Sequence, residues 1–100
     1  MSHNIKNAIV IMNQLGGNLF CTMIGVKKIM AVENGVIFNV TTNKLKCNYV
    51  QVTLNGSDLY DIQYLSIRAG KRTVKHEDNN VYAEDMIELF EQNTGLYAYL

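Results

Sequence analysis

The chain contains no proline, only two cysteines and no long hydrophobic run. Its longest apolar run, Ala8 to Met12, falls far short of the roughly 20 residues that a membrane-spanning helix needs. The first residues lack the apolar stretch of a signal peptide, and Cys21 and Cys47 lack the spacing of metal ligands. We therefore expect a cytoplasmic protein with reduced thiols, no membrane segment, no metal and no other cofactor.

Net charge is also lacking, because the basic and acidic residues balance to zero. Proteins that bind polyanions by general attraction are usually strongly basic, so this balance weighs against that function. The charge is unevenly spread, however. Residues 1–76 carry all nine Lys and Arg, whereas residues 77–100 carry six acids and no Lys or Arg. This asymmetry predicts a surface with two electrostatic sides.

Apolar spacing predicts a helix over residues 3–15, and the pair Gly16-Gly17 follows it. Phosphate-binding loops place their glycines before a helix, where free N–H groups point at the phosphate. Here the glycines follow a helix, so we expect them to end it rather than to bind a nucleotide. The face of this helix that we expect to be buried consists of Ile5, Ala8, Ile9, Met12 and Leu15.

Alternation predicts a strand over residues 18–25, and two Asn-Gly pairs predict hairpins. In the first hairpin the loop Asn34-Gly35 should pair Glu33 with Val36 and Ala31 with Phe38. The face expected in the core is Ile29, Ala31, Val36, Phe38 and Val40. The opposite face is Lys28, Met30, Val32, Ile37, Asn39 and Thr41.

The second hairpin is expected to join residues 47–54 to residues 58–67 through Asn55-Gly56 or Gly56-Ser57. Either loop gives the same two faces, and the sequence leaves open which one is buried. One face is Val50, Val52, Leu54, Leu59, Asp61, Gln63 and Leu65. The other is Tyr49, Gln51, Thr53, Tyr60, Ile62 and Tyr64. A shift of one residue in register would exchange these faces.

Residues 68–80 read as a polar connection with a short strand near Thr73 and Val74. A second amphipathic helix is expected over residues 81–93, capped by Asp78, Asn79 or Asn80. The pattern predicts one α+β domain over residues 1–100. We expect a two-layer sandwich in which an antiparallel sheet of four to five strands carries both terminal helices on one face.

No catalytic constellation emerges from the sequence, and we expect a protein that is not an enzyme. A Cys–His pair needs a thiolate beside an imidazole, but His3 lies near the N-terminus and His76 in the polar connection. The run His76, Glu77, Asp78 has metal-ligating atoms but no second cluster to complete a shell. We interpret it as solvated and helix-capping.

Two constellations suggest binding. Nucleic acid would use cations for phosphates and aromatic rings for bases. The candidate cations are Lys44, Lys46, Arg68, Lys71, Arg72 and Lys75. A protein partner, or a second copy of the chain, would contact the sheet face that the helices leave uncovered, or an acidic helix face. The candidate residues for this role are Tyr49, Tyr60, Tyr64, Glu84, Asp85, Glu88 and Glu91.

Three segments resemble small uncharacterised proteins of bacteriophages and prophages: QLGGNLFCTMIGVKK, NYVQVTLNGSDLYDIQYLSIRAG and VYAEDMIELFEQNTGLYAYL. They cover more than half of the chain. The resemblance implies a viral or mobile-element accessory protein acting inside a bacterial cell, and it brings no catalytic residues. Our leading hypothesis is binding to a host or viral protein, with inhibition of a defence or replication enzyme as one route. The alternative is a module that binds single-stranded nucleic acid through the basic loop and the tyrosine face.

Overall fold

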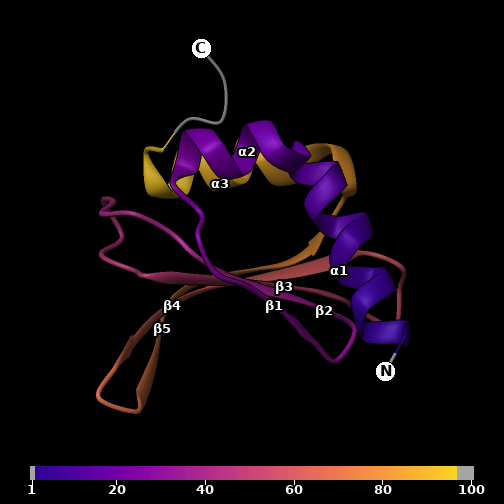
Figure 1. The fold of residues 1–100 in the computed structure, drawn as a ribbon, viewed down its shortest axis with the longest axis horizontal. Coiled ribbons are helices and arrows are strands. Elements are labelled where there is room, and N and C mark those ends of the chain that lie inside the picture. The colour runs from indigo at the N-terminus through magenta and orange to yellow at the C-terminus, as the bar shows by residue number, and fades with distance from the viewer. Residues whose placement is uncertain (1, 97–100) are drawn as a thin grey trace.

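The computed structural model describes residues 2–96, with side chains from Lys6 onward. The helices are α1 (Ser2–Leu15), α2 (Gly17–Ile24), the 3-10 helix η1 (Ala83–Asp85) and α3 (Met86–Thr94). The strands are β1 (Ile29–Val32), β2 (Gly35–Asn39), β3 (Tyr49–Leu54), β4 (Tyr60–Arg68) and β5 (Lys71–Val81). They form one antiparallel sheet in the order β1-β2-β3-β4-β5, with the helices packed on one side (Figure 1). The predicted two-layer α+β fold is confirmed.

The first helix ends where the sequence predicts, but the next element differs. Leu15 is the last residue of α1, and Gly16 follows with φ at 121°. The predicted strand over residues 18–25 is wrong, because α2 occupies most of this segment. Phe20 and Ile24 lie one helical turn apart and are both buried, while Leu19 is exposed. Gly17 opens α2, but α1 rather than a strand precedes the glycines, so the order of a phosphate loop is still missing.

The first hairpin has the predicted faces but a different loop. Val32 pairs with Gly35, so the loop is Glu33-Asn34, and the predicted pairing of Glu33 with Val36 is wrong. Ala31 likewise pairs with Val36 instead of Phe38, so the register differs from the prediction by two positions. A shift by an even number of residues preserves the two faces. The predicted core residues of the second strand, Val36, Phe38 and Val40, are buried. Ile29 and Ala31 share that face but stay exposed, since β1 is the outermost strand.

The second hairpin corrects the predicted faces. Leu54 pairs with Tyr60, and the N–H of Asn55 donates to the carbonyl of Leu59 at 2.8 Å. The loop is therefore residues 56–58, one residue longer than either predicted loop, and Asp58 rather than Gly56 takes a positive φ, at 61°. The extra residue shifts the register by one and exchanges the faces of β4. The core face now carries Val50, Val52, Leu54, Tyr60, Ile62 and Tyr64.

The predicted polar connection over residues 68–80 is largely a strand: the short strand expected near Thr73 and Val74 lies within β5, which is much longer. β5 pairs with β4 through the two-residue turn Ala69-Gly70, in which both residues have positive φ. The register shifts twice along β5, which marks two bulges. The predicted caps Asp78, Asn79 and Asn80 lie in this strand. They do not begin a helix, because α3 starts only at Met86, after η1, and no side-chain cap is present there.

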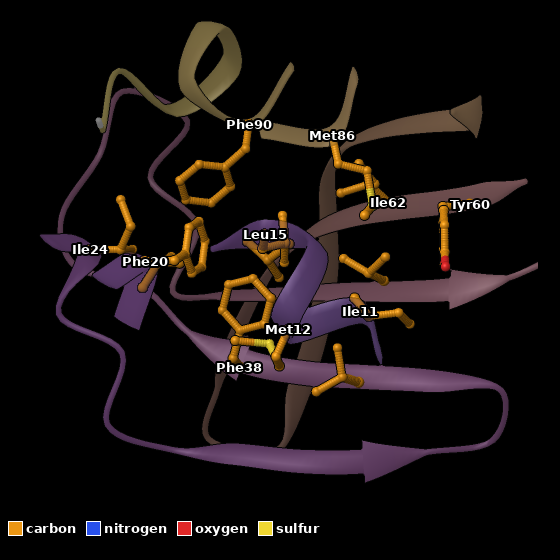
Figure 2. Packing of buried hydrophobic residues seen from close by; sticks show 14 of the residues in the cluster. Ile11, Met12, Leu15, Phe20, Ile24, Phe38, Tyr60, Ile62, Met86 and Phe90 are labelled. Carbon is orange, nitrogen blue, oxygen red and sulfur yellow. The ribbon is translucent and has the colours of Figure 1, made fainter. Parts of the chain in front are cut away.

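An aromatic cluster joins the two layers. The ring of Phe20 on α2 lies edge-on to Phe38 of β2, with centroids 5.6 Å apart, and to Phe90 of α3, with centroids 5.2 Å apart (Figure 2). Edge-to-face pairs of this kind add to the free energy gained by burial alone. Around them α1 buries Ala8, Ile11, Met12 and Leu15. Ile9, which we expected on this face, is 56% exposed, and the side chain of Ile5 lies outside those described.

Candidate binding surfaces

The three tyrosines predicted to share one sheet face, the candidate binding face, do not do so. Tyr60 and Tyr64 lie on the face beneath the helices and are buried. Tyr49 lies on the opposite face and is half-buried. The one-residue register shift of β4 separates them, because neighbouring positions along a strand point to opposite sides. A row of aromatic rings for base stacking is therefore absent from the described part of the sheet.

The sheet face away from the helices is mainly polar at its centre. The register aligns Met30, Ile37, Gln51, Gln63 and Glu77 across all five strands. The guanidinium of Arg72 donates to Oε1 of Gln51 at 2.9 Å and to Oε1 of Gln63 at 3.5 Å. Gln63 in turn donates to the carboxylate of Glu77 at 3.4 Å. These hydrogen bonds hold Arg72 against its own sheet, so this cation is less available for a ligand.

The β4–β5 hairpin forms a basic arm, which we define as residues 68–75. It extends away from the body of the molecule (Figure 1), and each of its eight residues is exposed. Arg68 pairs directly with Lys71 beside the turn, and Lys75 lies at a bulge. Arg68 also lines an open hollow of about 360 Å³ together with Lys46. The exposed Lys44 lies elsewhere, with its backbone N–H bonded to the carbonyl of Thr94 at the end of α3.

The predicted acidic helix face is smaller than expected. Glu84 and Asp85 lie in η1 and Glu88 in the first turn of α3, and all three are exposed. Glu91 is 8% exposed, so it does not belong to an open acidic surface. Carboxylates at the start of a helix are stabilised by the helix dipole. This placement gives Glu84, Asp85 and Glu88 a structural role that needs no partner.

A polar network fastens α3 to the sheet. Nδ2 of Asn93 donates to Asp78 at 2.8 Å and to the hydroxyl of Tyr64 at 3.3 Å. The other carboxylate oxygen of Asp78 lies 3.0 Å from Nε2 of His76. Burial raises the pKa of Tyr64 to about 12, with the hydrogen bond from Asn93 acting in the opposite direction. The phenol is therefore protonated at neutral pH and acts in packing rather than as a nucleophile.

The two cysteines are free thiols in different segments, and their surroundings indicate a structural role. Cys47 is buried in the segment before β3, and its Sγ donates to Oδ1 of Asn43 at 3.3 Å. Cys21, predicted on a strand, lies on α2 and is half-buried. Burial raises the pKa of both thiols, which disfavours the reactive thiolate. Among the described side chains no three His, Cys, Asp or Glu residues are grouped to hold a metal ion.

Exposed apolar side chains gather at the β1 side of the molecule. A groove of about 240 Å³ runs between α1 and α2 above β1, lined by Ala8, Ile9, Met12, Cys21 and Ile29 among others. Ile9 is 56%, Ile29 47% and Met30 63% exposed. We call this groove, together with strand β1, the apolar edge. Sequence reasoning missed it, because it assigned Ile9 to the core and Cys21 to a strand.

Comparison with protein-family models, with curated proteins and with solved structures finds no match for this chain. Within residues 2–96, none of the helices combines the length and the apolar character needed to cross a membrane.

Proposed function

We propose that this protein is a non-enzymatic binding protein that contacts another protein through the apolar edge. The observation that carries the proposal is an apolar groove bordered by Ile9 and Ile29, each about half exposed, beside the outer strand β1, whose Met30 is 63% exposed on the opposite sheet face. Exposed apolar patches that border a groove are typical of protein interfaces. Scattered apolar side chains on a surface need no partner, but a cluster at one edge favours one.

The resemblance to phage and prophage proteins leads us to propose a bacterial cell as the place of action. There the protein would act as an accessory protein by occupying a surface of its partner. Blocking a host defence or replication enzyme is one such outcome.

The test is capture of partners from bacterial lysate with and without nuclease, comparing the wild-type chain with Ile9→Gln combined with Met30→Gln. The matched control is Tyr82→Gln, because Tyr82 is 57% exposed and lies outside the apolar edge. We expect the wild type and the control to capture the same protein, whether or not the lysate is treated with nuclease. The double variant should fail to capture it. Capture that is unchanged in the double variant would refute this surface as the contact.

A second candidate function is nucleic-acid binding through the basic arm, favoured by the exposure of all eight of its residues. The register that buries Tyr60 and Tyr64 removes base stacking, so only phosphate contacts remain to carry the affinity. Replacing Arg68, Lys71 and Lys75 by Ala should then abolish most of the binding and flatten its salt dependence. The control replaces Lys6 and Lys44, which are exposed outside the arm. Equal affinity of the two variants would exclude this function.

A further inference from the structure

We infer that the apolar edge binds a second copy of this chain by antiparallel pairing of β1 with β1, which joins the two sheets into one. The inference rests on the proposed function, because it names the protein that this edge contacts. It is carried by three features of β1: the lack of protection along its free side, the direction of its backbone groups and the charges at its two ends.

The two outer strands of the sheet differ in how they resist pairing. β5 carries Lys71, Arg72, Lys75, Glu77 and Asp78 and is interrupted by two bulges, both of which discourage the addition of another strand. β1 has the sequence IMAV, with no charge, no register shift against β2 and three exposed residues among four. The molecule is therefore protected at one edge and open to pairing at the other.

The backbone of β1 presents its free groups outward at two positions. The carbonyl of Lys28 accepts a hydrogen bond from the N–H of Asn39, so Lys28 faces β2. Residues along a strand alternate in the side to which their N–H and carbonyl groups point. Ile29 and Ala31 therefore turn these groups toward the free side. If Ile29 of each copy pairs with Ala31 of the other, the two chains exchange about four backbone hydrogen bonds.

The same register matches the charges at the ends of the strand. It sets Met30 against Met30 of the second copy on the two-fold axis. Lys27 and Lys28 precede β1 and Glu33 follows it, and all three are exposed. An antiparallel arrangement brings the basic end of each strand to the acidic end of the other. The strand is thus complementary to a second copy of itself in the antiparallel arrangement. A parallel arrangement would instead place like charges beside each other.

The groove supplies the apolar contact that a four-residue strand cannot provide alone. A two-fold axis perpendicular to the sheet places the helices of both copies on the same side. The two grooves, each with Ile9 and Ile29 at its margin, then face each other across the axis. Since the backbone bonds are few, most of the affinity must come from burying these side chains, and the dimer is expected to be reversible.

The experiment measures molar mass by analytical ultracentrifugation over about a hundredfold range of concentration. We expect the wild type to shift from monomer to dimer, and Met30→Lys to weaken the dimer at least about tenfold by apposing like charges on the axis. Tyr82→Lys is the matched control and should dimerise as the wild type does. A wild type that stays monomeric throughout the range would overturn the inference.

Reversing the charges distinguishes antiparallel self-pairing from nonspecific disruption of the surface by the substitutions. Glu33→Lys alone, and Lys27→Glu with Lys28→Glu, should each weaken the dimer. The triple variant should recover it, because its two ends are again complementary. Failure of the triple variant to recover, with a urea midpoint that shows it to be folded, would contradict the pairing.

The lysate capture distinguishes this inference from the proposed function. The wild type could prove monomeric and yet capture a protein that the variant with Ile9→Gln and Met30→Gln does not capture. That result would refute self-pairing but support the binding function with a different partner. If the wild type is monomeric and its capture of proteins is unchanged by these substitutions, both the dimer and the proposed binding surface are refuted.

Discussion

At the scale of single residues, Gly35 is fixed by packing rather than by turn geometry. It is the first residue of β2, is buried and does not have a positive φ. A Cβ at this position would overlap the carbonyl oxygen of Val52 and approach Thr53 on the neighbouring strand. The glycine therefore permits β2 and β3 to approach closely.

Gly35→Ala should lower the free energy of unfolding by about 2 kcal/mol or more, because either the strands separate or the backbone distorts. Gly56→Ala is the matched control, since a Cβ there meets nothing within 4 Å. The control should change stability by less than about 1 kcal/mol. Urea unfolding followed by circular dichroism measures both. Equal midpoints for the two variants would disprove the packing role of Gly35.

Tyr64 makes stability depend on alkaline pH. Burial raises its pKa from 10.0 to about 12, so the folded state holds the phenolic proton more tightly than the unfolded state does. This contribution is fully present below pH 10 and is lost as the pH rises through 12. The shift corresponds to about 2–3 kcal/mol.

We expect Tyr64→Phe to reduce the loss of stability between pH 9 and 12 relative to the wild type. Tyr82→Phe serves as the control, because Tyr82 is exposed. Urea midpoints measured at several alkaline pH values test this. The expectation fails if the wild type and Tyr64→Phe lose stability in parallel.

At the scale of elements, the loop of the second hairpin is built around Asn55. Its Oδ1 accepts from the N–H groups of Ser57 and Leu59, and its Nδ2 donates to Asp61 at 3.1 Å and to Asn80 at 2.9 Å. One side chain thus closes the turn and ties it to β5. These hydrogen bonds hold the loop in its three-residue form, and the length of the loop fixes the register of β4.

Asn55→Ala should destabilise the fold by about 1–3 kcal/mol, because it leaves several donors and acceptors near the loop unpaired. Ser57→Ala, at an exposed neighbouring position, should be close to neutral. Thermal unfolding monitored by circular dichroism compares the two. A neutral Asn55→Ala would show that the loop is held by its backbone bonds alone.

The elements that the sequence predicted correctly are those with one dominant pattern. The spacing of Ala8, Met12 and Leu15 fits only a helix, and both terminal helices were found. The segment of α2 was mistaken because eight residues with apolar positions at Phe20 and Ile24 satisfy a strand and a helix alike. Of β5, only a short strand near Thr73 and Val74 was predicted, because its charged residues belong to an exposed edge strand, which carries little apolar signal.

At the scale of the whole molecule, the candidate surface depended on details that the sequence did not specify. One extra residue in the loop shifts the register of β4, so Tyr60 and Tyr64 point into the core and are not part of the predicted surface. The apolar edge arises where α1, α2 and β1 meet, so it required the helical assignment of residues 17–24. The basic arm was foreseen from composition, since four cations in eight residues are visible without coordinates.

The meander order of the sheet has a consequence for folding kinetics. Each strand pairs with its neighbours in sequence, and apart from residues 40–48 between β2 and β3 the connecting loops are short, so the entropy lost before contact is small. The chain also contains no proline, so no slow isomerisation of an X-Pro bond can delay refolding. We expect stopped-flow refolding from urea to follow one fast exponential without a phase of tens of seconds. A slow phase that grows with protein concentration would instead report association of the chains during refolding.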